Sequence, residues 1–289
     1  MIGKLLRYLR RRVVVLIKTP YFKVYPPKLE CNVCGWGDNR FDSNQWHRYT
    51  ICPRCGSKIR QRLLWAATQW APRLGNNQVL HGKRVLHFAP DKCLTKQIAA
   101  QASHYVTADL LATGYRYRRL DLVADMTNMT QVEDASFDCV IALDVLEHVP
   151  DYRKALQESN RVLALGGYCI FTVPQKDGLE TTYEDLTLTD AAAREAAFGQ
   201  KDHWRIYGDD LEDTIADFGF EVKAITASDI DPELVARHVL FPPVLSDHPF
   251  ATNYRKVYFG KKVKHVSPSG ATAAPASDTQ PLSRQRVRN

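Results

Sequence analysis

Residues 136–174, SFDCVIALDVLEHVPDYRKALQESNRVLALGGYCIFTVP, form the most informative stretch of this 289-residue sequence. Phe137–Leu143 is a short apolar run, which predicts a buried strand. Asp151 is a suitable N-cap for a helix that we expect to end before the glycine pair 166–167. Tyr168–Val173 is a second apolar run and predicts the next strand. The order strand, helix, strand is typical of a parallel sheet.

The same alternation extends from residue 83 to about residue 262, and it predicts a doubly wound α/β domain covered by helices on both faces. One helix is expected over Asp209–Phe218 and another, before the domain, over Ser57–Trp70. Further strands are expected at Arg84–Ala89, His104–Asp109, Arg119–Val123, Phe220–Ile225 and Tyr254–Lys261.

Four features of the quoted stretch recur together in one known family. They are the Phe-Asp start of the strand, Leu-Glu-His-Val at 146–149, Arg-Val-Leu at 161–163 and the glycine pair. In this order and spacing they resemble class I S-adenosylmethionine (SAM)-dependent methyltransferases of the type 11 group. The resemblance covers residues 83–262. It implies a seven-stranded, mostly parallel, Rossmann-like sheet with one reversed strand, and an enzyme that uses SAM.

The resemblance also implies a set of cofactor-binding residues. Asp144 and Glu147 follow a buried strand, at the edge where parallel sheets bind ligands. Asp109 ends the second strand, and an acid there accepts hydrogen bonds from ribose hydroxyls. Asp125 matches the family's contact to the adenine amine, and Met126 matches the residue that covers the ring.

The loop after the first strand departs from the family pattern. An acid and three glycines are usual there, whereas this chain has His87, Ala89, Pro90 and Asp91 within the stretch HFAPDKC. We expect His87 and Ala89 to occupy cofactor-binding positions of this loop. Our hypothesis is that Asp91 binds the cofactor's α-ammonium in place of the lost acid. A nicotinamide dinucleotide is disfavoured, because its pyrophosphate depends on those glycines.

Two histidines are candidate general bases for an acceptor hydroxyl. His148 lies at the predicted mouth of the sheet. His203 lies in the segment DHWRIY, residues 202–207, which resembles the acceptor-side loop of the family. In that loop Arg205 and Tyr207 are candidates to bind an anionic or hydroxylated acceptor, or to brace the loop. An isolated histidine is more often structural than catalytic, so both assignments stay open.

A four-cysteine pattern precedes the α/β domain. Two Cys-x-x-Cys-Gly pairs, Cys31/Cys34 and Cys52/Cys55, are separated by seventeen residues, which is the spacing of a structural zinc site. Residues 30–56 are therefore predicted to form a small zinc ribbon, and disulfides or free thiols are the weaker alternatives. A segment this short cannot build a stable core without metal. His47 is a substitute ligand, and three aromatic residues, Trp36, Phe41 and Trp46, are expected to pack around the site.

Charge is concentrated at the two ends. The first 29 residues carry +8 and the last 29 carry +5, so the body between them carries −6 of the total of +7. An acidic body argues against a broad phosphate-binding surface there. We divide the chain into a basic arm (1–29), the ribbon (30–56), a helical connector (57–82), the methyltransferase domain (83–262) and a disordered basic tail (263–289).

The basic arm leaves the localisation open. Its longest apolar run is Val13–Ile17, far below the ~20 residues that cross a bilayer, and a reducing, cytoplasmic setting is expected. An amphipathic helix within residues 1–19 would suit peripheral contact with the inner face of a membrane. The same helix would equally dock a partner or pack on the ribbon.

Three function classes fit the sequence. The first is a methyltransferase acting on a small molecule or a saccharide. The second is an RNA methyltransferase that holds nucleic acid with the ribbon and the basic ends. The third is a non-catalytic scaffold with a decayed cofactor site. The sequence predicts neither the acceptor nor the oligomeric state.

Overall fold

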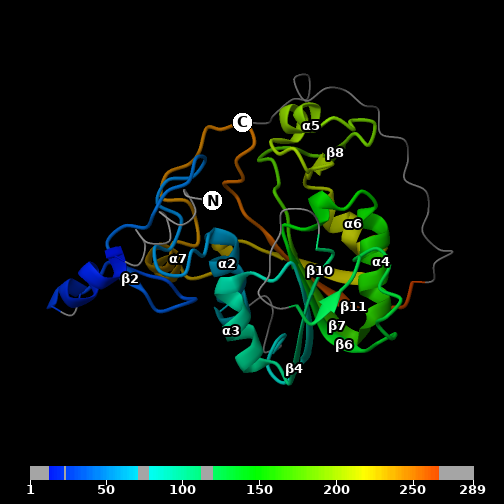
Figure 1. Cartoon of the computed structure of the whole chain (residues 1–289), viewed down its shortest axis with the longest axis horizontal. Coiled ribbons are helices and arrows are strands. Elements are labelled where there is room, and N and C mark those ends of the chain that lie inside the picture. The colour runs from blue at the N-terminus through cyan, green and yellow to red at the C-terminus, as the bar shows by residue number, and fades with distance from the viewer. Residues whose placement is uncertain (1–12, 23, 71–77, 112–119, 267–289) are drawn as a thin grey trace.

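The computed structural model describes residues 13–22, 24–70, 78–111 and 120–266. Its centre is a seven-stranded sheet in the order β10-β11-β7-β6-β3-β4-β5 (Figure 1). β11 runs antiparallel to both of its neighbours, whereas the other pairs in the sheet are parallel. The predicted seven-stranded sheet with one reversed strand is confirmed. The strands are β3 (Arg84–Phe88), β4 (His104–Asp109), β5 (Leu122–Val123), β6 (Phe137–Leu143), β7 (Leu163–Thr172), β10 (Phe220–Ile225) and β11 (Val257–Lys262).

The deciding stretch folds nearly as predicted, with one difference. Helix α4 (Tyr152–Val162) follows β6, and the Asp151 side chain caps it by accepting from the Lys154 amide at 3.0 Å. β7 begins immediately at the end of α4, five residues earlier than expected, and runs through the glycine pair. Gly166 has φ +78°, and the register between β6 and β7 shifts near Phe137. The helix therefore ends before the glycine pair, as predicted, and the pair lies in a strand irregularity.

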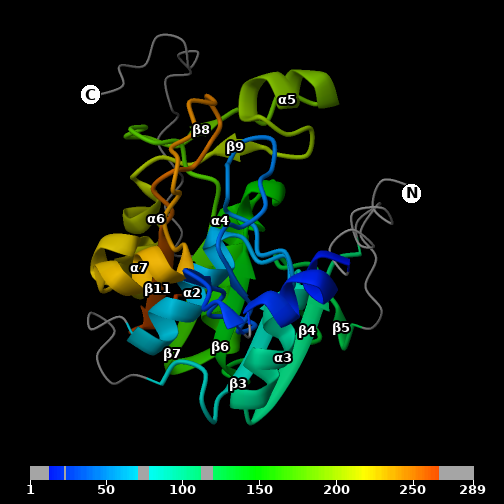
Figure 2. The same cartoon turned by 90° about the vertical axis from the view of Figure 1, so that its left-hand side faces the viewer.

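Helices cover both faces of the sheet. One face carries α2 (Ile59–Trp70), α3 (Lys92–Gln101) and α7 (Pro232–His238), and the other carries α4 and α6 (Leu211–Asp217) (Figures 1 and 2). Alternate residues of β6 belong to the two resulting cores: Cys139 and Ile141 lie on the first face, and Val140 and Ala142 lie on the second. All four are fully buried, which explains why the strand reads as continuously apolar.

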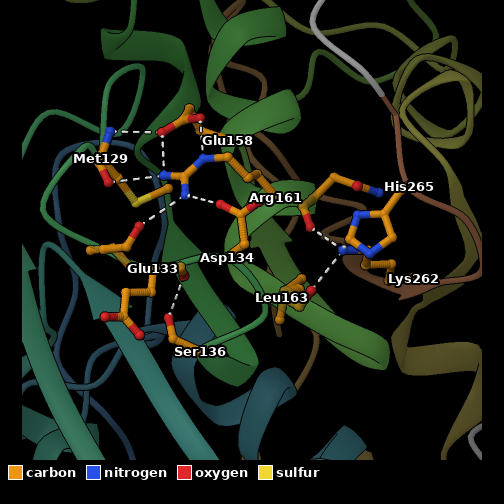
Figure 3. Close-up of polar contacts among 11 residues, drawn as sticks. Met129, Glu133, Asp134, Ser136, Glu158, Arg161, Leu163, Lys262 and His265 are labelled. Atoms are coloured by element: carbon orange, nitrogen blue, oxygen red, sulfur yellow. Dashed lines mark hydrogen bonds and ion pairs between the residues drawn. The ribbon is translucent and has the colours of Figure 1, made fainter.

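The end of α4 is fixed by two basic side chains (Figure 3). Arg161 donates to both carboxylate oxygens of Glu158 and to the backbone oxygens of Met129 and Val132, at 2.7–2.9 Å. It thereby ties the loop before β6 to the helix. Lys262 of β11 donates to two carbonyls at the helix end, those of Asn160 and Leu163, at 2.6 and 2.7 Å. These contacts give a structural reason for the Arg-Val-Leu pattern.

The cysteine module, residues 30–56, packs against the α2 side of the sheet. Its Trp36 and Phe41 are buried in the same core as β6 residues of that face. Fully buried Arg62 of α2 donates to the module carbonyl of Thr50 at 2.8 Å and to the carbonyls of His238 and Val239, each at 2.9 Å. One guanidinium therefore joins the module, α2 and the end of α7.

Three short elements lie together beyond one end of the sheet: β8 (Tyr183–Glu184), α5 (Ala191–Phe198) and β9 (Arg205–Ile206) (Figures 1 and 2). The proposed membrane helix falls mainly on residues outside those described, as does the basic tail beyond residue 266. In the described part of the chain no helix has the length and apolar character needed to span a bilayer.

Candidate functional site

A cavity of about 570 Å³ opens at the carboxyl ends of β3 and β6, between the sheet and the cysteine module. This is the position at which the strand order reverses, and doubly wound sheets bind ligands there. The predicted site residues that line it are Ala89, Asp91, Asp144, Glu147 and His148. Six segments that are far apart in the sequence contribute to the wall, including the start of α2 and the stretch from 250 to 255.

Asp144 is the centre of an ion cluster in this cavity. One carboxylate oxygen accepts from Thr172 at 2.8 Å and from Arg255 at 2.9 Å, and the other lies 3.1 Å from Nη1 of Arg60. Burial alone raises the pKa of Asp144, but the two guanidiniums hold it below its ordinary value. The carboxylate is therefore charged and fixed in place.

Asp91 lies next to this cluster and retains unused bonding capacity. It is the N-cap residue of α3, but its side chain makes no cap bond and instead accepts from Gln61 at 2.9 Å. Burial raises the pKa of the Asp91 carboxyl, and the Arg60 guanidinium 3.6 Å away opposes this rise. Oδ2 of Asp91 and Nε of Arg60 are both buried and, among the described residues, have no hydrogen-bond partner.

These two unpartnered atoms, on groups of opposite charge beside one cavity, match the two ends of an α-amino acid. A carboxylate oxygen suits an α-ammonium, and a guanidinium N–H suits an α-carboxylate. SAM carries such an end. The donor set therefore fits the amino-acid end of that cofactor, and it agrees with the hypothesis for Asp91.

The backbone at the cavity shows how the loop functions without glycine. Ala89 has φ +46°, and Asp144 has φ +53°, so the residues after β3 and β6 are both left-handed. Such a conformation costs a non-glycine residue about 1–3 kcal/mol and is concentrated at functional sites. Ala89 thus adopts the conformation that a glycine would favour at this position.

His87 lies away from the cavity. Its side chain is fully buried and its Nδ1 lies 2.9 Å from the Tyr105 hydroxyl. Burial lowers the pKa of His87 to about 3, so the ring is neutral where the family has an acid. Its Nε2 has no partner among the described residues. Direct cofactor binding by His87 stays a prediction.

The predicted adenosine contacts lie outside the cavity wall. Asp109 accepts from the Leu111 amide at 2.9 Å, and Asp125 accepts from the amide and hydroxyl of Thr127, each at 2.8 Å. Met126 is 4% exposed and packs in the core on the α4 side. Residues 112–119, between β4 and β5, lie outside the described residues. The roles of these three residues therefore stay predictions.

Glu147, His148 and His203 form a second compact group at the cavity edge. The rings of the two histidines meet edge to face with centroids 4.8 Å apart. The pKa of His203 is lowered to about 4, mainly because the ring is buried and secondly because His148 is next to it. The pKa of Glu147 is raised well above its ordinary value, mainly because the side chain is buried and secondly because Asp144 is close to it. His203 is neutral at physiological pH, as a general base must be before it accepts a proton.

Arg205 and Tyr207 do not line the cavity. The Arg205 side chain is completely buried and donates to the carbonyls of Leu146, Val149 and Pro150 at 2.6–2.9 Å. It also pairs with Glu184. The contacts are those of a brace, which was one of the two alternatives. Acceptor binding by Arg205 and Tyr207 remains a prediction.

The four cysteines of the module converge. Their Sγ atoms all lie within 4.8 Å of one another, and the Cys31–Cys55 and Cys34–Cys52 pairs are each 3.7 Å apart. A disulfide needs ~2.05 Å, so these pairs are not bonded. Tetrahedral zinc with Zn–S bonds of ~2.3 Å has S–S edges of ~3.8 Å. The donor set therefore fits the predicted zinc ion, and His47 is not part of the cluster.

The module also forms one wall of the cavity. Trp46, which was expected to pack around the metal, instead stacks on His248 with ring centroids 5.0 Å apart. Of the three remaining cysteines, Cys139 and Cys169 are buried, whereas Cys93 lines the cavity. The module residues on this wall are Asn44, Trp46, His47, Thr50, Cys55 and Gly56.

Sequence reasoning did not identify Arg60, Gln61 or Arg255 as residues of this site. Arg60 is 84 positions before Asp144, and Arg255 is 111 positions after it. Isolated arginines carry no spacing signal over such separations. Only the packing of α2 on the sheet and the position of the strand β11 bring them together.

Comparison with known proteins finds similarity to methyltransferases. Residues 91–171 match the family model described as a methyltransferase domain. A solved SAM-dependent methyltransferase from Mesorhizobium loti is 16% identical and covers 71% of this chain and 100% of its own, with a TM-score of 0.45. The family match over residues 91–171 and the strand order of the sheet agree with a Rossmann-like methyltransferase fold.

Two further matches were found. The 1,6-didemethyltoxoflavin-N1-methyltransferase of Burkholderia thailandensis, solved with bound 1,6-didemethyltoxoflavin and S-adenosylhomocysteine, is 17% identical. It covers 71% of this chain and 83% of its own, with a TM-score of 0.42. An uncharacterised 37.1 kDa protein in transposon TN4556 of Streptomyces fradiae is 41% identical over 63 residues, 22% of this chain. The matched segment spans only 18% of that relative.

Proposed function

We propose that the chain is a SAM-dependent methyltransferase whose acceptor is a small molecule or a saccharide. The observation that carries this proposal is the pair of orphaned, buried atoms beside the cavity, Oδ2 of Asp91 and Nε of Arg60. A decayed cofactor site would not be expected to keep a buried carboxylate oxygen and a buried guanidinium N–H without hydrogen-bond partners, because each such atom costs free energy until a ligand satisfies it.

The far wall of the cavity suits a small polar acceptor. Trp46 and Phe250 offer aromatic surface, and Asn44, Gln200 and Thr252 offer hydrogen-bonding groups. Mixed aromatic and polar walls around a volume of about 570 Å³ are typical of small-molecule sites. The cysteine module supplies two of these five residues, so we infer that it takes part in acceptor binding.

SAM, when bound, supplies a methyl group on a sulfonium that is already a good leaving group. The residues of this chain then orient the acceptor and exclude water, and alignment alone contributes about 7–11 kcal/mol. His203, neutral and paired edge to face with His148, is the candidate to take a proton from an acceptor hydroxyl. Zinc in the cysteine module supplies folding free energy and so holds the acceptor wall in place.

Binding of S-adenosylhomocysteine tests the cofactor half of the proposal. A saturating concentration should raise the melting temperature of the full chain, because a ligand that binds only the folded state stabilises it. Asp91→Asn should abolish most of this shift, whereas Asp138→Asn, on the opposite end of the sheet, should preserve it. No shift for the unmodified chain would refute the proposed cofactor.

Transfer of labelled methyl groups tests the acceptor half. Fractions of small metabolites and glycans should accept label from SAM, and RNA should not. An RNA methyltransferase is the alternative that exposed Arg40, Arg48 and Arg54 of the cysteine module favour. RNA binding that weakens steeply with salt, together with label transfer to RNA, would establish the alternative.

A further inference from the structure

The group formed by Glu147, His148 and His203 has the composition of a metal site. One ligand atom from each residue lies within 4.8 Å of those of the other two. The described residues contain only one other such group, the four cysteines. Two imidazoles and one carboxylate form the ligand set of catalytic zinc and of non-haem iron centres.

Two of the three side chains are buried with an unused ligand atom. His203 is 2% exposed and Glu147 is 1% exposed. Nε2 of His203 and Oε2 of Glu147 have no hydrogen-bond partner among the described residues. A buried carboxylate and a buried imidazole left in this state are costly, and a cation between them would satisfy both.

The third side chain has the tautomer that metal binding needs. Nδ1 of His148 lies 3.3 Å from the backbone oxygen of Asp202. Since a carbonyl oxygen only accepts, Nδ1 carries the hydrogen and Nε2 keeps its lone pair. That Nε2 lies 3.9 Å from Oε1 of Glu147. Metal-binding histidines commonly donate their other N–H to a carbonyl or carboxylate in this way.

The two segments that carry these residues are held in register. Glu147 and His148 belong to the 3-10 helix after β6, and His203 precedes β9. The Trp204 amide donates to the Glu147 carbonyl at 3.0 Å. Arg205, whose guanidinium donates to the carbonyls around the same turn, reinforces this link. Such supporting contacts fix ligand positions before a metal arrives.

From this geometry we propose that Glu147, His148 and His203 bind one divalent transition-metal ion, such as Zn²⁺, distinct from the ion of the cysteine module. In a tetrahedral site with metal–ligand bonds of ~2.1 Å, the ligand atoms lie ~3.4 Å from one another. Side-chain rotations that move these atoms by about 1 Å would therefore complete the site. Three protein ligands leave open positions for a substrate, and Glu147 and His148 line the cavity.

The chemical role of this ion rests on the proposed methyl transfer. A hydroxyl of the acceptor bound at an open position is acidified and releases its proton to water. Its oxygen then forms a bond to the methyl carbon, and the electron pair of the broken carbon–sulfur bond stays on sulfur. With the ion bound, His203 would serve as a ligand and not as the proton acceptor, and the ion would allow a hydroxyl acceptor to react without a strong protein base.

Metal content measured by mass spectrometry tests the proposal. The full chain, dialysed against Zn²⁺ and freed of excess, should hold a second equivalent beyond that of the four cysteines. His203→Ala and Glu147→Gln should each lose this equivalent and keep the first, while His104→Ala, at an exposed position on β4, should keep both. Metal content that is the same in all four proteins would overturn the proposal.

Cobalt gives a second measurement that does not depend on folding losses. Co²⁺ bound to thiolates shows intense sulfur charge-transfer absorption, whereas Co²⁺ bound to nitrogen and oxygen shows only weak ligand-field bands. The weak bands should disappear in His203→Ala while the charge-transfer bands persist. A spectrum containing thiolate features alone in the unmodified chain would refute the second site. Binding of S-adenosylhomocysteine is measured separately, so a failure of the cofactor proposal can be distinguished from a failure of the second metal site.

Discussion

The cysteine module and the cofactor cavity are built in opposite ways. The module draws its four ligands from 25 consecutive residues, Cys31 to Cys55, whose spacing alone predicts their convergence. The cavity draws charged groups from residues 60, 91, 144 and 255, which only the packed fold brings together. The module also forms one wall of the cavity. We therefore expect a one-sided dependence: the cavity needs the module, but a metal bound by the four cysteines would not need the cavity.

Cys52→Ser should produce the largest effect. Structural zinc sites contribute roughly 10–16 kcal/mol of binding free energy to folding, so the variant should lose zinc and the order of the module. Because the module packs in the core shared with α2 and the sheet, binding of S-adenosylhomocysteine should disappear as well. Zinc analysis and calorimetric titration measure the two losses.

Asp91→Asn is the reciprocal variant. It should weaken binding of S-adenosylhomocysteine and retain zinc, and Cys93→Ser should retain zinc too, because Cys93 is outside the cluster. If Cys52→Ser still binds S-adenosylhomocysteine, the claim that the cavity needs the cysteine module is wrong.

Arg62→Met should have the next largest effect. The change removes a buried guanidinium and leaves the carbonyls of Thr50, His238 and Val239 without their donor. Each buried carbonyl left without a donor costs about 1–3 kcal/mol. Urea denaturation should reveal the loss, whereas Arg54→Met, at an exposed position of the module, should change the free energy of unfolding by less than about 0.5 kcal/mol.

Arg60→Ala should affect binding more than folding. The proposed charged hydrogen bond to the cofactor's carboxylate is worth about 1.5–3 kcal/mol, which corresponds to roughly a tenfold to hundredfold weaker Kd for S-adenosylhomocysteine. Adenosine lacks the amino-acid end, so its affinity should be unchanged. If the affinities for S-adenosylhomocysteine and adenosine fall equally, Arg60 does not bind the cofactor's carboxylate.

His87 should make stability depend on pH. Its pKa is about 3 in the folded chain and about 6.5 when unfolded, so between these values only the unfolded state holds the proton. Stability should therefore fall as pH decreases below 6.5, by about 1.4 kcal/mol per pH unit from this residue. His87→Gln should flatten the decline between pH 7 and 5.5 in urea denaturation. His104→Gln, at an exposed position, should leave the slope as it is.

Ala89→Gly should produce the smallest change. Glycine removes the cost of a left-handed alanine but adds freedom to the unfolded chain, so the net gain in stability should be about 0.5–1 kcal/mol or less. Ala89→Val, which is β-branched, should be destabilising at the same position. A destabilised glycine variant would show that φ +46° is not strained here.

The sequence predicted what local patterns encode. Strands β4, β6 and β10 have the predicted bounds, because apolar runs and turns define them. The end of the helix before the glycine pair was predicted correctly, but the start of β7 at Leu163 was not, because glycines can also lie in an irregular part of a strand. Arg60 and Arg255 were missed because their partner Asp144 is reached only through tertiary packing. Arg205 shares a motif with His203, yet its completely buried position was not visible in the motif.

A crystal structure of the full chain with S-adenosylhomocysteine tests the central claim most directly. The account predicts density for the ligand in the cavity at the ends of β3 and β6, with its ammonium on Asp91 and its carboxylate on Arg60. Ligand density elsewhere, or a cavity that stays closed by the Arg60–Asp91 pair at saturating ligand, would contradict it.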